Sequence, residues 1–294
     1  MKRPHPWLLT LLFLSGILVI LVVAVGLLVV WMEGAESFKG GERVAVVRLE
    51  GVVLDPRPVL EALDRYGKDP KVRAIVLRVD TPGGAVGPTQ EIFQGVRQWN
   101  KSKKVVASLG SMATSGGYYV ACGAERILAN PGTITGSIGV VVHFANLERL
   151  LEKLGIQGEV IRSGAHKDMG SPHRALTSEE KALLQGVVDD VHGQFVEAVA
   201  EARNLPKEQI RSLADGRIFS GRQAHTLGLV DELGGLQDAV KAAAALVGIA
   251  QEPRVVDEHK ERFSLLDLLL GETLGKIAPS ADPRMPPIGY IFYP

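Results

Sequence analysis

The chain contains 294 residues, 46% of them hydrophobic, and its 33 Lys and Arg residues balance 33 Asp and Glu residues. This length allows one sizeable domain, or two small ones, together with a membrane segment. The balanced charge gives no general attraction to nucleic acid, and we expect no nucleic-acid partner. Cys122 is the only cysteine, so an intramolecular disulfide and a CxxC motif are excluded. The histidines show no close ligand spacing, and we expect neither a metal nor a cofactor.

The N-terminal segment predicts a single transmembrane helix. Residues 7–32 carry no charged side chain and, at about 1.5 Å per residue, are long enough for a hydrocarbon core of about 30 Å. The apolar run continues beyond Ala24 and Gly26, which favours an uncleaved anchor over a secretory signal. Because basic residues precede it and acidic residues follow it, we expect residues 1–6 to form a cytoplasmic tail and the rest of the chain to lie outside the cytoplasmic membrane.

Strands and helices alternate after a glycine-rich linker at residues 33–43. The predicted elements, in chain order, are residues 44–49 (strand), 59–66 (helix), 72–79 (strand), 89–99 (helix) and 103–109 (strand). This alternation indicates an α/β fold with a mostly parallel sheet that helices cover on both faces. In such sheets, sites form at the carboxyl ends of the strands.

The second half of the chain has shorter predicted strands and one long helix. We expect strands at residues 126–129, 139–143 and 159–161, a turn-rich loop at 130–137, and helices at 147–154 and 236–247. The long helix begins at Thr177, with Glu180 three residues later in a capping-box pattern. Its apolar positions predict one buried face, formed by Leu184, Val187, Val188, Val191, Phe195 and Val199.

The predicted catalytic domain spans residues 44–250. Residues 251–294 contain six prolines and an isolated apolar patch at 263–270, so we expect a tail or a partner-binding arm. One hypothesis places this patch on a neighbouring molecule or in a substrate groove, because it would otherwise be exposed.

Ser115 is the candidate nucleophile. It lies in the stretch GSMATSGGYY, which follows an apolar strand and precedes a possible helix. Free N–H groups at a helix N-terminus favour developing negative charge, although a plain small-residue turn would have the same composition. A serine hydroxyl also needs an adjacent base. The candidate bases are His143, His166 and Lys167, with Asp168 or Asp80 as the carboxylate of a Ser-His-Asp arrangement.

Backbone N–H groups could supply an oxyanion hole. Gly116 follows Ser115 directly, and Gly83 or Gly84 follows the neighbouring strand. A lysine base must be neutral to accept the serine proton, which an apolar pocket would favour. The choice between lysine and histidine stays open at this point.

Four motifs in order resemble the bacterial signal peptide peptidases of the SppA type. They are DTPGG (80–84), GSMATSGGYYVACGAERILANPGTITGSIGV (110–140), SGAHKDMGSP (163–172) and GRIFSGRQAHTLGLVDELGG (216–235). The resemblance covers roughly residues 44–247 and the anchor. It implies a Clp-protease/crotonase-like fold of repeated ββα units and a Ser-Lys dyad. It also implies a homo-oligomer in which neighbouring subunits share sites.

The resemblance assigns roles to individual residues. Ser115 would be the nucleophile and Lys167 the general base, while Ser137 would help to hold the lysine amine. Gly116, with Gly83 or Gly84, would donate to the oxyanion. Asp80 departs from the family pattern, which commonly has Asn there, and we assign it no role because an unpaired carboxylate would oppose an oxyanion.

These observations predict a membrane-anchored serine endopeptidase. Its expected partners are peptide substrates, the membrane and further copies of itself, and its expected task is to degrade cleaved signal peptides and similar apolar peptides at the outer face of the cytoplasmic membrane. One alternative is a crotonase-like acyl-thioester enzyme, which would need a coenzyme A pocket and would leave Ser115 without a use. The other is a non-catalytic membrane scaffold.

Overall fold

The computed structural model describes residues 42–257 and 288–291, and in the N-terminal segment residues 7, 13–17, 20–21 and 23–24. Residues 1–41 and 42–294 form two separate units. Among the described residues, no helix is long and apolar enough to cross a membrane. Most of the predicted anchor at 7–32, the cytoplasmic tail at 1–6, nearly all of the linker and the apolar patch at 263–270 lie outside the described residues.

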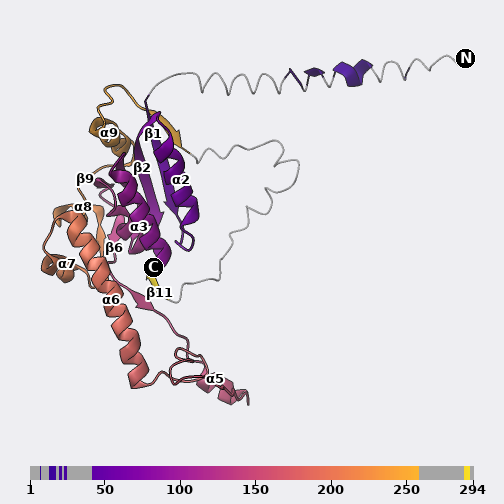
Figure 1. Ribbon diagram of the computed structural model, residues 1–294, viewed down its shortest axis with the longest axis vertical. Helices are drawn as coiled ribbons and strands as arrows, with labels where there is room; N and C mark the ends of the chain where they lie inside the picture. The colour runs from indigo at the N-terminus through magenta and orange to yellow at the C-terminus, as the bar shows by residue number, and fades with distance from the viewer. Residues whose placement is uncertain are drawn as a thin grey trace, which may run out of the picture. The chain divides into compact units, whose positions relative to one another are not determined.

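A mostly parallel sheet forms the centre of the second unit (Figure 1). Its path is β10-β1-β2-β4-β5-β9, and all neighbours on this path are parallel. These strands are β1 (Arg43–Glu50), β2 (Val72–Thr81), β4 (Lys104–Thr114), β5 (Arg126–Ala129), β9 (Glu232–Leu233) and β10 (Arg254–Asp257). β6 (Ile134–Gly136) pairs parallel with β4, and β8 (Ile218–Ser220) pairs antiparallel with β6. The predicted α/β fold with a parallel-rich sheet is confirmed.

Continuous apolar runs form the central strands because both faces of the sheet are covered. Successive side chains of a strand point to opposite faces, so β1 contributes to two cores. Val44 and Val46 pack with α9 (Leu236–Leu246) on one face. Ala45 and Val47 belong to the larger core on the other face. That face is covered by α2 (Arg57–Lys68), α3 (Val86–Asn100), α4 (Gly116–Ala121) and part of α6 (Ser178–Arg203). The remaining helices are α5 (Glu148–Lys153), α7 (Lys207–Leu213) and α8 (Gly221–Thr226).

Several predicted boundaries were wrong. Residues 159–161 form no strand and are exposed, because no neighbouring strand is present to pair with them in the described part of the chain. The predicted loop at 130–137 contains β6, and of residues 139–143 only Val141–Val142 form a strand, β7. Residues 254–257, predicted as part of the tail, add β10 to the edge of the main sheet.

A second, three-stranded sheet lies beside the main one. Its central strand is β11 (Ile288–Ile291), which pairs antiparallel with β3 (Gly83–Ala85) and with β7. The C-terminal strand is thus placed beside Gly84, two hundred residues earlier in the chain. β11 also lies against α4, the helix that begins directly after Ser115.

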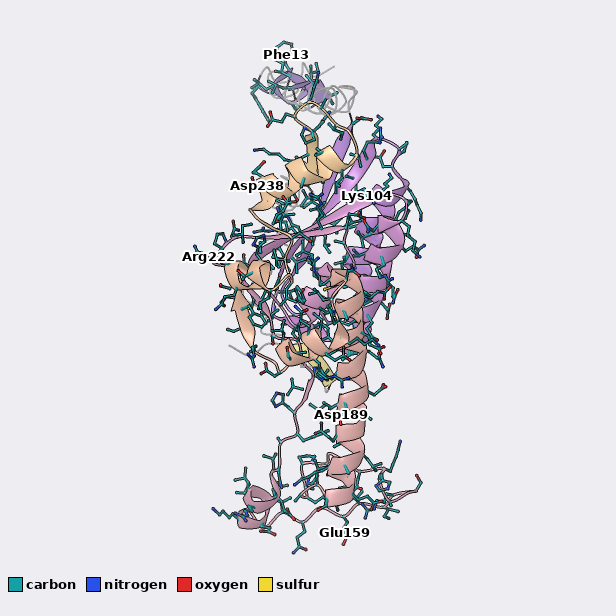
Figure 2. The ribbon with its side chains drawn as sticks, turned by 90° about the vertical axis from the view of Figure 1, so that its left-hand side faces the viewer. Phe13, Lys104, Glu159, Asp189, Arg222 and Asp238 are labelled. Carbon is teal, nitrogen blue, oxygen red and sulfur yellow. The ribbon has the colours of Figure 1, made fainter. Side chains whose placement is uncertain are left out.

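The long helix α6 connects the core with a projecting arm (Figures 1 and 2). Its C-terminal half contributes Phe195 and Val199 to the core, as predicted, and also Val196. Its N-terminal half runs away from the sheet, and Figure 2 shows Asp189 along this stretch and Glu159 at the far end. We call residues 143–187 the arm, which contains α5 and the first turns of α6. Val187, predicted to be buried, is 47% exposed.

Candidate active site

Ser115 occupies a strained turn between β4 and α4. Its φ of 52° and ψ of −116° lie outside the regions that L-residues usually adopt, and such strain costs about 1–3 kcal/mol. The surroundings hold it firmly: Ser115 N–H donates to Gly136 O at 2.8 Å, and Tyr119 N–H donates to Ser115 O at 2.9 Å. Ser115 is 1% exposed. The structure therefore places this serine at the carboxyl end of a central strand, as predicted.

The helix that follows Ser115 is anchored by two tyrosines. The Tyr119 ring makes edge contacts with Phe93 and Phe195, with centroid separations of 4.8 and 4.9 Å. The Tyr118 hydroxyl donates to Leu229 O at 2.8 Å, and burial raises the Tyr118 pKa. Cys122, just after the helix, is also buried, and burial raises the pKa of its thiol to about 12. This cysteine is a buried core residue.

Gly83 and Gly84 lie in β3, next to the Ser115 turn. Gly83 has a φ of +104°, and a Cβ on Gly84 would lie only 2.1 Å from Val53 O, so both positions require glycine. The Gly83 N–H donates to the Thr81 hydroxyl at 3.0 Å. To bind an oxyanion, the Gly83 N–H would have to give up its hydrogen bond to Thr81. Among the described hydrogen bonds, the Gly84 N–H has no side-chain acceptor.

The Asp80 side chain is hydrogen-bonded to the backbone of β4. Its Oδ1 accepts a hydrogen bond from Met112 N–H at 3.1 Å, and it packs against Gly110, where a Cβ would lie 2.5 Å from Oδ2. The strand pairing passes from Val79↔Leu109 to Thr81↔Ala113, so β4 has two extra residues opposite Asp80. The carboxylate therefore replaces a backbone acceptor at an irregularity of the sheet.

Ser137 lies beside Ser115. Thr114 and Gly136 are paired across β4 and β6, so the residues that follow them are on neighbouring strand ends, about 5 Å apart. Ser137 also has a positive φ, of 51°, and its N–H donates to Arg217 O at 2.8 Å. The structure thus brings together Ser115, Ser137 and the glycines of β3.

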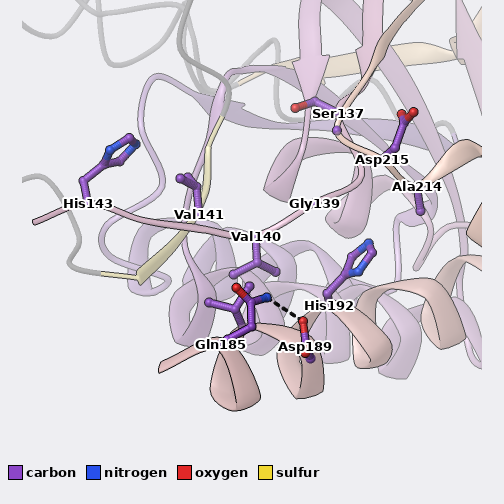
Figure 3. Close-up of a pocket in the computed structure, with 12 residues that line it drawn as sticks. Ser137, Gly139, Val140, Val141, His143, Gln185, Asp189, His192, Ala214 and Asp215 are labelled. Carbon is purple, nitrogen blue, oxygen red and sulfur yellow. Dashed lines mark hydrogen bonds between the residues drawn. The ribbon is translucent and has the colours of Figure 1, made fainter. Parts of the chain in front are cut away.

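A cavity of about 490 Å³ opens beside Ser137, between the 137–143 segment and α6 (Figure 3). His192 lines it, and its Nε2 is buried with no hydrogen-bond partner among the described residues. Asp189 accepts a hydrogen bond from Gln185 at 2.7 Å. His192 and Asp189 were not predicted from the sequence, because both lie on a helix face whose neighbours are distant in the chain. Figure 3 shows His143 at the far end of this lining from Ser137.

Lys167 and His166 lie far from Ser115 of the same chain. They flank the first turn of α6: the His166 imidazole is 3.8 Å from Glu179, and Asp168 binds Arg174, which binds Glu180. Glu180 and Phe195 are separated along α6 by roughly 22 Å, at about 1.5 Å per residue. Since Phe195 packs on Tyr119, one turn after Ser115, a single chain brings neither Lys167 nor His166 to the serine. No group of three or more potential metal ligands occurs among the described residues.

Comparisons with known proteins agree with this geometry. Residues 97–250 match peptidase family S49. The chain is 44% identical to a candidate protease of Synechocystis sp., over 80% of this chain and 86% of that protein. It is 36% identical to a candidate protease of Methanocaldococcus jannaschii, over 90% of this chain and 91% of that protein. It is 38% identical to a candidate signal peptide peptidase SppA of Enterococcus faecium, over 71% of this chain and 64% of that protein. The chain therefore belongs to peptidase family S49 and is a protease of the SppA type.

Proposed function

We propose that the chain is a serine endopeptidase in which Ser115 works with Lys167 of the partner subunit in a homo-oligomer. The observation that carries this proposal is the strained, buried turn at Ser115, held by Gly136 at a strand end. Strain of this kind persists only where the surroundings enforce it, and it gathers at active sites. The family match favours this reading over an acyl-thioester enzyme and over a scaffold.

The proposed reaction has two stages. The Ser115 Oγ forms a bond to the substrate carbonyl carbon, while the lysine amine takes the hydroxyl proton. The oxyanion is bound by the Gly116 N–H and by Gly83 or Gly84. The C–N bond then breaks, and the lysine returns the proton to the leaving amine. Water, deprotonated by the same amine, hydrolyses the acyl-enzyme and restores Ser115.

The arm supports a base that comes from a second copy. Its exposed apolar side chains include Leu150 (53%), Leu154 (63%) and Ile161 (103%), and Val187, on the helix face predicted to be buried, is 47% exposed. Exposed apolar surface of this extent is typical of an interface. If a second copy covers the arm, Lys167 at its end can enter a site that its own chain cannot reach. The cavity beside Ser137 offers space for the amine.

The second sheet supports binding of an extended peptide. β11 pairs antiparallel with β3, at the glycines that are candidates for the oxyanion hole. A substrate that takes the place of β11 would form the same backbone ladder, which is the strand-addition mode of peptide recognition. Such a ladder recognises the peptide backbone more than the side chains, so it can bind peptides of varied sequence.

The substrates that we propose are cleaved signal peptides and similar apolar peptides at the outer face of the cytoplasmic membrane. The proposal rests on the uncharged run at residues 7–32, which would hold the site at the surface where such peptides emerge. The basic residues before that run and the acidic ones after it favour an N-terminus inside.

The test is reaction of the full-length chain, in detergent, with a fluorophosphonate probe and an apolar peptide. We expect labelling and cleavage by the wild type and neither by Ser115→Ala. Lys167→Ala should also lose cleavage, while His166→Ala should retain it. Full cleavage by Ser115→Ala, or loss of cleavage in His166→Ala but not in Lys167→Ala, would overturn the proposal.

A further inference from the structure

The loop that carries Lys167 is tied to the first turn of α6 by one arginine. We call residues 162–174 the lysine loop. The Arg174 guanidinium donates to Asp168 through Nε (3.0 Å) and Nη2 (2.9 Å), and to Glu180 through Nη1 (2.8 Å) and Nη2 (2.5 Å). Asp168 is the residue directly after Lys167, and Glu180 belongs to the rigid helix. Arg174 therefore joins the neighbour of the proposed base to a fixed support.

Both carboxylates are arranged to stay charged. The Arg174 hydrogen bonds lower the Glu180 pKa to about 2, and Arg174 with Arg162 lowers the Asp168 pKa below its usual range. Glu180 also closes the capping box with Thr177, accepting from the Thr177 N–H at 2.9 Å. A planar guanidinium that bridges two carboxylates fixes geometry as well as charge, which a lysine ammonium cannot do.

The other side of the lysine loop is held by packing. Gly170 lies against the Phe144 ring so closely that a Cβ would meet Cε1 at 2.4 Å. Leu147 N–H donates to Pro172 O at 2.8 Å, just before α5. The loop is thus fixed at Asp168, at Gly170 and at Pro172, while the Lys167 side chain, directly before the first of these contacts, stays exposed.

We propose that Arg174 is a positioning residue that holds Lys167 in the orientation from which it reaches Ser115 of the partner subunit. This inference rests on the proposed function. Among the described residues, the hydrogen bonds of Arg174 lie within the arm, to Asp168, Glu180 and Ala175 O, and none reaches the main sheet. Loss of Arg174 therefore removes the link between Asp168 and Glu180 on α6, while Asp168 keeps its contact with Arg162, and it leaves the core unchanged. A base displaced by about 1 Å can lose about 100-fold in rate.

The experiment compares Arg174→Ala, Arg174→Lys and Asp168→Asn in the full-length chain, with kcat, KM, melting temperature and oligomer size measured for each. We expect Arg174→Ala to lower kcat by about 10- to 100-fold with KM changed less than about threefold. Arg174→Lys should recover only part of this loss, and Asp168→Asn should lose kcat in the same way. The control is Lys207→Ala, which removes an exposed ion pair with Glu197, 2.6 Å long, at the other end of α6.

Two outcomes separate this inference from the proposed function. If Lys167→Ala is inactive but Arg174→Ala and Asp168→Asn keep the wild-type kcat, the positioning role is overturned and the dyad stands. If Lys167→Ala is fully active, the proposed function itself fails. A loss of activity in Arg174→Ala that coincides with dissociation of the oligomer, and that Asp168→Asn does not share, would also overturn the inference, because Arg174 would then act through the interface.

Discussion

The backbone N–H of Ser115 donates to the carbonyl oxygen of Gly136 at 2.8 Å, and this bond joins the candidate nucleophile to β6, the strand that ends directly before Ser137. It explains how two segments more than twenty residues apart share one site. β6, which provides Gly136, lies between β4 and β8. The orientation of Ser115 therefore depends on Gly136.

Gly136→Ala should disturb this arrangement. Gly136 has a φ of +80°, and a Cβ there would lie 2.5 Å from the Phe219 ring. We expect a loss of about 1–3 kcal/mol in stability together with reduced labelling of Ser115. Gly132→Ala is the matched control, because a Cβ at Gly132 meets nothing within 4 Å. Chemical denaturation and the rate of fluorophosphonate labelling measure the two effects. Equal behaviour of the two variants would contradict the role of Gly136.

Asp80→Asn should retain both stability and activity. The Asn Oδ1 can accept the Met112 N–H as the carboxylate does, so the irregularity in β4 remains supported. Asp80→Ala leaves that N–H without its acceptor and should cost roughly 1 kcal/mol or more. Denaturation curves and peptide cleavage test both variants. A large loss in Asp80→Asn would mean that the charge of Asp80 matters.

Removal of residues 286–294 should lower the KM for peptide substrates. β11 pairs with β3 and β7 in the position that we propose for the substrate, so the tail and the peptide compete. Gly289→Pro is a milder version, because proline removes a backbone donor from the ladder. Steady-state kinetics on the truncated and substituted chains measure the effect. A KM that is unchanged or raised in both would show that peptides bind elsewhere.

The stability that the Arg174–Glu180 pair provides should decrease as the pH is lowered. The Glu180 pKa is lowered from 4.5 to about 2, so its contribution is fully present above about pH 4.5 and is lost as the pH falls toward 2. Glu180→Gln should therefore be less stable than the wild type at pH 5–8, and the difference should shrink below pH 4.5. Glu179→Gln, at the exposed neighbouring position, serves as the control. A stability difference that grows on acidification would contradict this assignment.

The central strands could be predicted from the sequence because they are buried on both faces and their apolar runs are continuous. The Ser115 turn was also recognisable, since strand, small residues and helix follow one another locally. The path of α6 could not be predicted, because Val187 has the spacing of a buried residue and yet is 47% exposed among the described residues. A periodic pattern shows which helix face is apolar but not which molecule covers it.

The position of Lys167 illustrates the same limit. The motif around it pointed to a base, but the distance to Ser115 depends on the length and direction of α6, which no local pattern encodes. β11 was missed for a related reason. The segment IGYI has β-branched and aromatic residues typical of a strand, but its partners β3 and β7 lie far away in the chain.

Mixing Ser115→Ala with Lys167→Ala tests most directly whether two subunits share the site. Each variant alone should be inactive in peptide cleavage. When the two are dissociated, mixed in equal amounts and reassembled, a subunit that retains Ser115 can meet a neighbour that retains Lys167. Random mixing should then restore about a quarter of the wild-type sites. Each site takes its serine from one subunit and its lysine from the neighbour, and about half of the subunits at each of these two positions carry the intact residue. Mixed oligomers that remain inactive, while wild-type chains recover activity after the same treatment, would contradict a dyad formed between subunits.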